Sequence, residues 1–294
     1  MKTETNFLEG KESKVIISFA IPMIIGNIFQ QLYNVADTII VGKFIGPEAL
    51  AAVGSAFSVM VLLTSIIFGQ FRFKRRHLHF NKKILKMITN NSVLSSIQQS
   101  IMNFGILLIQ GLVNSFGVSV MAAFTAVVKI ESFAYMPVQD FGNAFSIFVA
   151  QNKGAGQLKR IHKGIRSALK IITIYCLIIT SFILIFAKPL LYIFINKDKI
   201  EILNIGTQYL YIVAVFYCLI GYLFMFYGLF RGYGRPEVSI ILTIASLGTR
   251  VALAYTLSAI PWIGILGIWW SIPIGWAIAD IIGLIMVKFL LKKP

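Results

Sequence analysis

The chain has 294 residues, of which 57% are hydrophobic and only 13% charged, and its formal net charge is +16 at pH 7. Soluble domains are about half apolar and about a quarter charged, so this composition excludes an ordinary soluble protein. The apolar runs reach the roughly twenty residues that cross a bilayer as a helix, and they lack the short alternating pattern of a membrane β-barrel. We therefore expect an all-α, polytopic membrane helix bundle.

Eight membrane spans are predicted from these runs, at residues 15–41, 49–69, 87–114, 118–150, 165–190, 203–230, 237–260 and 264–289. An even number of spans places both termini on one side of the membrane, and that side also holds most of the 27 Lys and Arg. By the positive-inside rule the basic side is cytoplasmic. The charge is then an orientation signal that also attracts anionic lipid, so we expect no nucleic-acid partner.

The first predicted span carries a polar stripe, formed by Asn27, Gln30, Asn34 and Asp37. Successive members are three or four residues apart, so on a helix they lie along one face. An acid inside a membrane span is expensive, and by default it marks a functional site that faces a protein interior or a water-filled cavity. Pro22, earlier in the same span, predicts a bend.

Two interpretations of Asp37 are open. Burial at low dielectric favours the neutral form of a carboxyl group, so binding of a proton or Na+ at Asp37 could bias one of two conformations. Alternatively, the side chain hydrogen-bonds to neighbouring helices and only fixes their packing.

An internal repeat is visible between the first and third spans. Gln30-Gln31 recurs as Gln98-Gln99, and the heptapeptide GPEALAA recurs as GVSVMAA. A second polar stripe, which includes Gln99 and Asn103, lacks an acid. Internal repeats are typical of secondary transporters. The alternative is that apolar helices resemble one another by composition.

The fourth predicted span contains two acids, Glu131 and Asp140. They are nine residues apart and so lie on opposite faces of a helix, which excludes a catalytic dyad. Glu131 either faces a cavity as a cation-binding acid or neutralises Lys129 or Arg250. Pro137 is expected to kink the helix near its middle.

The other motifs predict no enzyme chemistry and no cofactor. The glycine-rich turn RGYGRPE lacks the Walker spacing of a phosphate loop, and the three histidines lie in basic loops without nearby acids or cysteines. Cys176 and Cys218 fall in apolar runs, so we expect buried thiols rather than a disulfide. For Asp140 and Asp280 we expect only interhelical packing contacts.

Four stretches carry a family resemblance, and they comprise residues 21–54, 129–156, 228–238 and 264–280. The first reads IPMIIGNIFQQLYNVADTIIVGKFIGPEALAAVG and the third GLFRGYGRPEV. They resemble the multidrug and toxic compound extrusion (MATE) family of cation-coupled efflux transporters. The resemblance implies two six-helix lobes and export of amphipathic, often cationic small molecules in exchange for Na+ or H+. It also implies that Asp37 matches the first-helix acid of the family and that Pro22 matches the bend before it.

Together, the polar stripes, the prolines and the resemblance predict cation coupling at Asp37, Asn34 and Glu131, helix bends at Pro22 and Pro137, and a possible substrate cavity at Gln30, Gln31, Gln99 and Asn103. A Na+ ion at Asp37 is the only metal expected.

The chain is shorter than the family pattern. Residues 1–69 resemble a remnant of the first lobe with two helices, residues 70–86 a basic cytoplasmic linker, and residues 87–294 the complete second six-helix lobe. The resemblance thus implies an internal deletion of about four helices from the first lobe.

We therefore expect an efflux transporter of the bacterial cytoplasmic membrane, with both termini inside. One alternative is a membrane-inserted relic without transport, or a half-unit that needs a partner such as a second copy of the chain. The other is an exporter of lipid-linked saccharides, whose cavity would be strongly cationic; the acids Asp37 and Glu131 argue against it.

Overall fold

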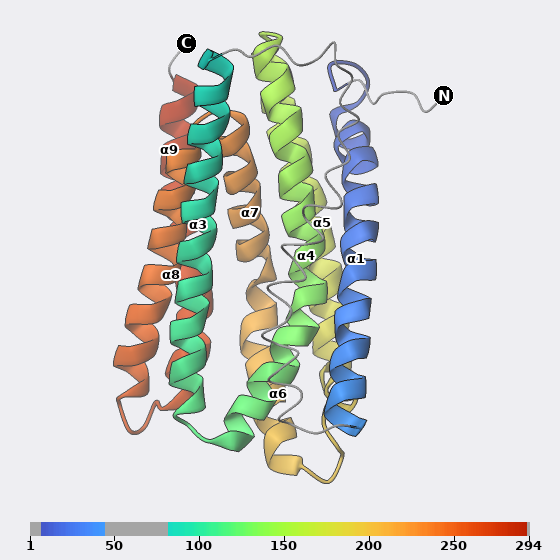
Figure 1. Ribbon diagram of the computed structural model, residues 1–294, viewed down its shortest axis with the longest axis vertical. Helices are drawn as coiled ribbons and strands as arrows, with labels where there is room; N and C mark the ends of the chain where they lie inside the picture. Colours follow the sequence, from blue (N-terminus) through green and yellow to red (C-terminus); the bar gives the residue numbers. More distant parts are fainter. Residues whose placement is uncertain (1–6, 45–81, 293–294) are drawn as a thin grey trace. The chain divides into compact units, whose positions relative to one another are not determined.

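A computed structural model describes residues 7–44 and 82–292 of the chain; for residues 33–44 and part of the first turns of α3 it gives the helix without the side chains. In these ranges the chain forms helices and no strand (Figure 1). The helices are α1 (Glu12–Phe44), α3 (Lys82–Asn114), α4 (Val118–Gly154), α5 (Leu158–Tyr192), α6 (Ile200–Val213), the 3-10 turn η2 (Ala214–Phe216), α7 (Tyr217–Gly232), α8 (Pro236–Ser258) and α9 (Ile265–Lys292). The predicted all-α membrane fold is confirmed for the described residues.

Seven segments of the described chain are long and apolar enough to cross a membrane. They coincide with seven of the eight predicted spans. The span predicted at 203–230 consists of α6 and α7, which η2 joins end to end. The span predicted at 49–69 lies outside the described residues.

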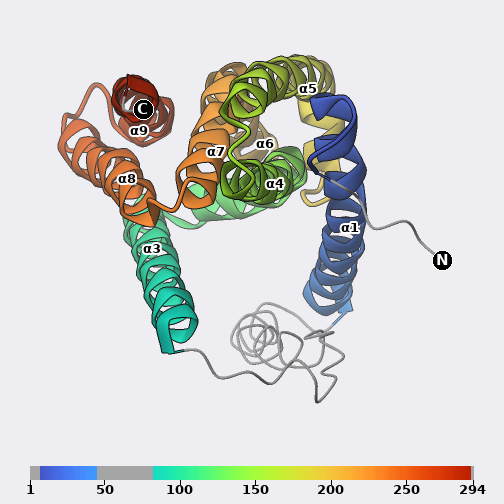
Figure 2. The same ribbon diagram turned by 90° about the horizontal axis from the view of Figure 1, so that it is seen from above.

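The chain divides into two compact units, one of residues 1–26 with 93–294 and one of residues 27–92. Within the first unit, α4 packs against α5, α6 and α7, α8 pairs with α9, and α7 contacts both members of that pair (Figure 2). The second unit holds the rest of α1 and the first turns of α3. The domain boundary predicted at residue 69 lies outside the described residues, so the predicted division into lobe remnant, linker and second lobe stays a prediction.

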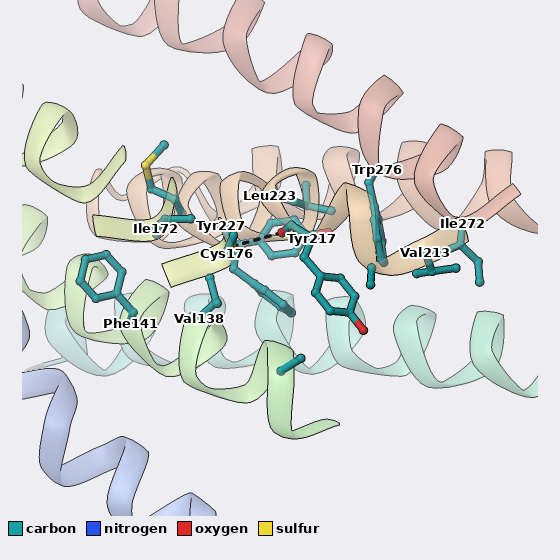
Figure 3. Close-up of a cluster of buried hydrophobic side chains, with 14 of the residues drawn as sticks. Val138, Phe141, Ile172, Cys176, Val213, Tyr217, Leu223, Tyr227, Ile272 and Trp276 are labelled. Atoms are coloured by element: carbon teal, nitrogen blue, oxygen red, sulfur yellow. Dashed lines mark hydrogen bonds between the residues drawn. The ribbon is translucent and has the colours of Figure 1, made fainter. Parts of the chain in front are cut away.

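The core of the first unit is apolar and tightly packed. Figure 3 shows side chains from α4, α5, α7 and α9 meeting there, including Val138, Ile172, Tyr217 and Trp276. The Cys176 thiol donates to the backbone oxygen of Tyr217 at 3.4 Å. Both cysteines are free thiols; Cys176 is buried, whereas Cys218, which the sequence predicted to be buried, is half-buried.

Glycines allow α4 and α7 to touch through their backbones. A Cβ atom on Gly142 would lie 2.6 Å from the carbonyl oxygen of Phe224, and one on Gly228 would overlap the carbonyl oxygen of Gly142. A Cβ atom on Gly232, one turn after Gly228, would likewise overlap the carbonyl oxygen of Ser146 in α4. Small residues four apart are the usual means by which membrane helices approach this closely. The crossing fixes α4, and with it Glu131, against α7.

Both prolines predicted to bend helices lie inside helices, Pro22 in α1 and Pro137 in α4. The bends themselves stay predictions. A kink of known position lies instead in α5, where Phe186 has non-helical torsions (φ −104°, ψ 16°) three residues before Pro189. The proline ring and its missing N–H account for that interruption.

One end of the first unit gathers the basic connections. There Lys153, in the last turn of α4, donates to the backbone oxygen of Tyr233 at 2.6 Å and links the α4–α5 and α7–α8 connections. Arg160, in the first turn of α5, donates to the backbone oxygen of Gly10 at 2.8 Å, which brings the segment before α1 to the same end. The last turns of α9 lie there too (Figure 1).

Candidate functional site

Glu131 forms the best-defined polar centre inside the first unit. It lies in α4 and is only 6% exposed. The Tyr209 hydroxyl donates to Oε2 at 2.9 Å, and the Tyr217 hydroxyl lies 3.4 Å from Oε1. Tyr209 belongs to α6 and Tyr217 begins α7, so the two donors approach the carboxyl group from either side of η2.

Aromatic rings hold the nearer donor in place. The Tyr209 ring meets Trp269 of α9 edge to face with a centroid separation of 4.6 Å. Trp269 in turn stacks on Phe124 of α4 at 6.0 Å. Tyr209 and Trp269 are almost completely buried, so water has little access to this side of Glu131. The orientation of the Tyr209 hydroxyl is therefore set by packing.

Arg250 of α8 supplies a positive charge near this acid. It interacts electrostatically with Glu131, and its Nε is buried without a hydrogen-bond partner among the described residues. The sequence left open whether Glu131 binds a cation or neutralises Lys129 or Arg250. The structure brings Arg250 into the Glu131 centre, which we define as Glu131, Tyr209, Tyr217, Arg250 and Trp269.

The residues predicted for the first-span site lie mostly beyond what the structure describes. Asn34 and Asp37 are in α1, but their side chains are outside the described residues. Gln30 is exposed and Gln31 buried. The cation site at Asp37 therefore stays a prediction.

The two polar residues predicted from α3 are exposed and bonded to each other. Gln99 Nε2 donates to Asn103 Oδ1 at 3.2 Å, one helical turn along α3. The adjacent Gln98 is instead buried and donates to Thr243 Oγ1 of α8 at 3.0 Å. Sequence reasoning missed Gln98, because a one-residue step around a helix decides which of two neighbouring glutamines faces another helix.

The acids Asp140 and Asp280 are both buried in the first unit. Asp280 differs from Glu131, because neither of its carboxyl oxygens has a hydrogen-bond partner among the described residues. Three or more metal-ligating side chains do not cluster anywhere in the described part of the chain.

Sequence reasoning also missed a contact that fixes the chain before α1. Arg160 donates through Nη1 to the backbone oxygen of Gly10 and through Nη2 to that of Glu9, both at 2.8 Å. Asn152 Nδ2 donates to the backbone oxygen of Phe7 at 3.2 Å. We call these contacts the N-terminal clasp. Their acceptors are backbone atoms, so no side-chain pattern in the sequence announces them.

Comparison with known proteins identifies the family. The MatE family model matches residues 22–70 and 92–256, well over half of the chain. The chain belongs to the MatE family. The match includes nearly all of three stretches that carried the resemblance, at residues 21–54, 129–156 and 228–238, while the fourth, at 264–280, lies beyond it.

Two curated relatives of this MatE chain come from Bacillus subtilis strain 168. "Probable multidrug resistance protein YoeA" is 26% identical over 282 residues, a match that covers 90% of this chain and 60% of the relative. "Probable multidrug resistance protein YpnP" is 25% identical over 244 residues and is covered to 54%. The MatE chain thus spans little more than half the length of these relatives. That difference is consistent with a first lobe shortened by an internal deletion.

Solved structures share the fold. The MatE chain superposes with a TM-score of 0.70 on the outward-facing conformation of a multidrug resistance MATE family transporter of the MOP superfamily. The match has 24% sequence identity and covers 85% of this chain and 58% of the other.

Proposed function

We propose that this MatE chain is a secondary active efflux transporter that exchanges amphipathic organic cations for H+ or Na+, and that Glu131 is a coupling acid. Membership of MatE and the two relatives named as probable multidrug resistance proteins support efflux. The observation that supports the role of Glu131 is its burial in a membrane helix with two tyrosine hydroxyls directed at its carboxyl group.

Cation binding would change the balance of charge in the Glu131 centre. A buried carboxylate must be compensated, and here two hydroxyls and the charge of Arg250 share that task. A tyrosine hydroxyl both donates and accepts, so it can turn from donor to the carboxylate into a ligand of a bound cation. Proton or Na+ binding would also weaken the attraction between Glu131 and Arg250. The position of α8 relative to α4 is therefore the conformational variable that we expect the cation to bias.

The first-span assignments form part of the same proposal. Asp37 and Asn34 would provide a second coupling site, with Na+ as the metal that Asp37 could hold. Gln30, Gln31, Gln99 and Asn103 would line the path of the substrate. Mobile organic cations, lipid and the coupling ion are the only partners this function needs, and it needs no cofactor and no enzyme chemistry.

We place the chain in the bacterial cytoplasmic membrane with the basic end of the first unit, and hence both termini, in the cytoplasm. The clustering of Lys153, Arg160 and the α7–α8 connection at one end supports this orientation. A cysteine introduced at the exposed Lys159 should react with an impermeant maleimide only in inverted vesicles. Labelling in intact cells would show that this end faces the outside and would contradict the proposed orientation.

Two copies of the chain are the most direct way to complete a transport chamber. The match to YoeA covers only 60% of that relative. In the family that the chain resembles, the transport chamber lies between two full lobes. The same length favours the competing function, a membrane-inserted relic without transport. Export of lipid-linked saccharides is disfavoured, because an acid lies at the centre of the described lobe.

A transport assay with a matched control separates these functions. The chain is expressed in an efflux-deficient bacterium, and energy-dependent loss of ethidium is followed by fluorescence. Wild type and Glu237→Gln, which changes an exposed acid at the start of α8, should export ethidium equally. Glu131→Gln should lose export while inserting into the membrane at normal levels. Inserted wild-type protein without energy-dependent efflux would establish the relic instead.

A further inference from the structure

Asp280 is a buried acid that the Glu131 centre does not use. It lies in α9, is 6% exposed, and has no hydrogen-bond partner for either carboxyl oxygen among the described residues. Neither of the ion pairs recorded in the described chain includes it. A charged carboxylate left this way in a membrane helix is strongly disfavoured, so the group requires a proton or another cation.

The packing of α9 on α8 fixes the neighbours of Asp280. The two helices run antiparallel, with Gly267 against Leu257 and Gly275 against the carbonyl oxygen of Ser246. Continuing this register by five residues along α9 places Asp280 level with the turn that contains Thr243. Gly283, on the same side of α9 as Asp280, lies against the ring of Phe226 in α7. The acid therefore sits where α7, α8 and α9 meet.

Polar atoms from three other helices gather at this level. Tyr227 of α7 interacts electrostatically with Asp280 and also interacts with Thr243. The Thr243 hydroxyl accepts from Gln98 of α3 at 3.0 Å and donates to the backbone oxygen of Ser239 at 2.9 Å. We call Asp280, Tyr227, Thr243 and Gln98 the inner cluster. It presents hydroxyl and carboxyl oxygens, the ligand type that protons and alkali cations take.

Among the described residues, the cation that interacts electrostatically with Tyr227 of the inner cluster is Arg231 of α7. Its guanidinium donates to Asn143 Oδ1 at 2.8 Å and to the backbone oxygen of Tyr227 at 3.2 Å. On α8 the buried polar residues are the hydroxyl-bearing Ser239, Thr243 and Ser246. α6 meets α9 at Tyr209 and Trp269, which belong to the Glu131 centre.

The two acids occupy different depths of the lobe. Trp269, beside the Glu131 centre, precedes Asp280 on α9 by eleven residues, which is about 16 Å along a helix axis. Asp280 lies toward the end that carries the basic connections, because α9 runs to that end (Figure 1). The inner cluster is therefore a separate site and not an extension of the Glu131 centre.

We propose that Asp280 is a second cation site of the first unit. It binds and releases a proton or a Na+ ion, and the hydroxyl oxygens of Tyr227 and Thr243 are its neighbours. Binding requires only the folded first unit. It does not depend on whether the chain transports.

Infrared difference spectroscopy of the purified full chain in nanodiscs tests the proposal. Spectra of wild type and Asp280→Asn are compared across pH, with and without NaCl, and Asp198→Asn is the control at an exposed acid. We expect a protonated-carboxyl band in wild type and in Asp198→Asn that is lost in Asp280→Asn and kept in Glu131→Gln. Loss of the band on adding Na+ at constant pH identifies Na+ as the ligand. A band that responds to pH alone identifies the proton.

Two outcomes would overturn the proposal. One is an Asp280 band that is present and unchanged at every pH and NaCl concentration, which means a permanently neutral structural acid. The other is a set of spectra identical in wild type and folded Asp280→Asn. If Asp280→Asn does not fold, Tyr227→Phe replaces it, because loss of the hydroxyl should shift the frequency of the same band; an unshifted band would equally overturn the proposal.

Discussion

Glu131 and Asp280 are two acids buried in the first unit, and their surroundings differ. Glu131 has two tyrosine hydroxyls and the charge of Arg250 around it, whereas the described residues provide hydroxyls near Asp280 but no hydrogen bond to its oxygens. Binding of a proton or Na+ at either residue, as we propose, would change the charge buried around it. Substitution of the neighbouring hydroxyls therefore tests the proposal at the scale of single residues.

Tyr209→Phe should destabilise the lobe more than Tyr217→Phe does. The Tyr209 hydrogen bond to Glu131 is 2.9 Å long and that of Tyr217 is 3.4 Å. Loss of a hydrogen bond to a buried charged partner costs about 1–3 kcal/mol, and a long bond costs less. The free energy of unfolding is measured by SDS titration in mixed micelles. Tyr211→Phe, at an exposed tyrosine of α6, is the control, and equal losses at positions 209 and 217 would contradict the geometry.

Sequence predicted part of the Glu131 centre and could not have predicted the rest. An acid in an apolar helix stands out in the sequence, and its separation from Asp140 follows from helical geometry alone. Arg250 was a candidate neighbour from the sequence, but its selection over Lys129, and that of Tyr209 and Tyr217, depends on how α4, α6, α7 and α8 pack. Many tyrosines in apolar runs look alike until that packing is known.

At the scale of elements, the close crossing of α4 and α7 anchors the site. The glycines at positions 228 and 232 form the small-residue pattern that membrane helices use, so this contact has a signal in the sequence. The kink at Phe186 also has a sequence signal, Pro189, which our sequence analysis did not use, whereas the η2 turn has none. The turn at 214–216 contains neither glycine nor proline, and we have no local explanation for it.

Gly228→Ala should destabilise the lobe by about 1–3 kcal/mol, because the new methyl group would overlap the carbonyl oxygen of Gly142 and force the helices apart. Gly248→Ala is the matched control. That position is exposed in α8 and its Cβ would meet nothing within 4 Å, so alanine there should be neutral or slightly stabilising. Unfolding midpoints of the two variants in SDS provide the comparison. Equal midpoints would show that the α4–α7 contact is looser than the structure has it.

The N-terminal clasp should hold the segment before α1 against α5. Arg160→Ala removes the two 2.8 Å hydrogen bonds to the backbone of Glu9 and Gly10, and Arg160→Lys cannot restore their forked geometry. We expect faster hydrogen exchange in residues 7–12 for both variants, measured by mass spectrometry in nanodiscs. The exposed neighbour Lys159→Ala should exchange like wild type. Unchanged protection in Arg160→Ala would mean that other contacts hold the segment.

At the scale of the whole molecule, hydropathy predicted the membrane segments well because the bilayer imposes one length on all of them. The family followed from a few motifs in the first, fourth, sixth and last predicted spans, and the match of the MatE model to residues 22–70 and 92–256 confirms it. The consequence of the shortened length for transport could not be derived from motifs. It depends on whether the Glu131 centre operates in the chain as it stands.

Transport by purified protein tests that central claim most directly. The chain is reconstituted into proteoliposomes, and uptake of a fluorescent organic cation is followed after an outward-directed proton or Na+ gradient is imposed. We expect gradient-driven uptake by wild type, equal uptake by Glu237→Gln, and uptake reduced to the level of empty liposomes by Glu131→Gln. Gradient-driven uptake that survives in Glu131→Gln would contradict the role of this acid, and its absence from folded wild-type protein would contradict transport itself.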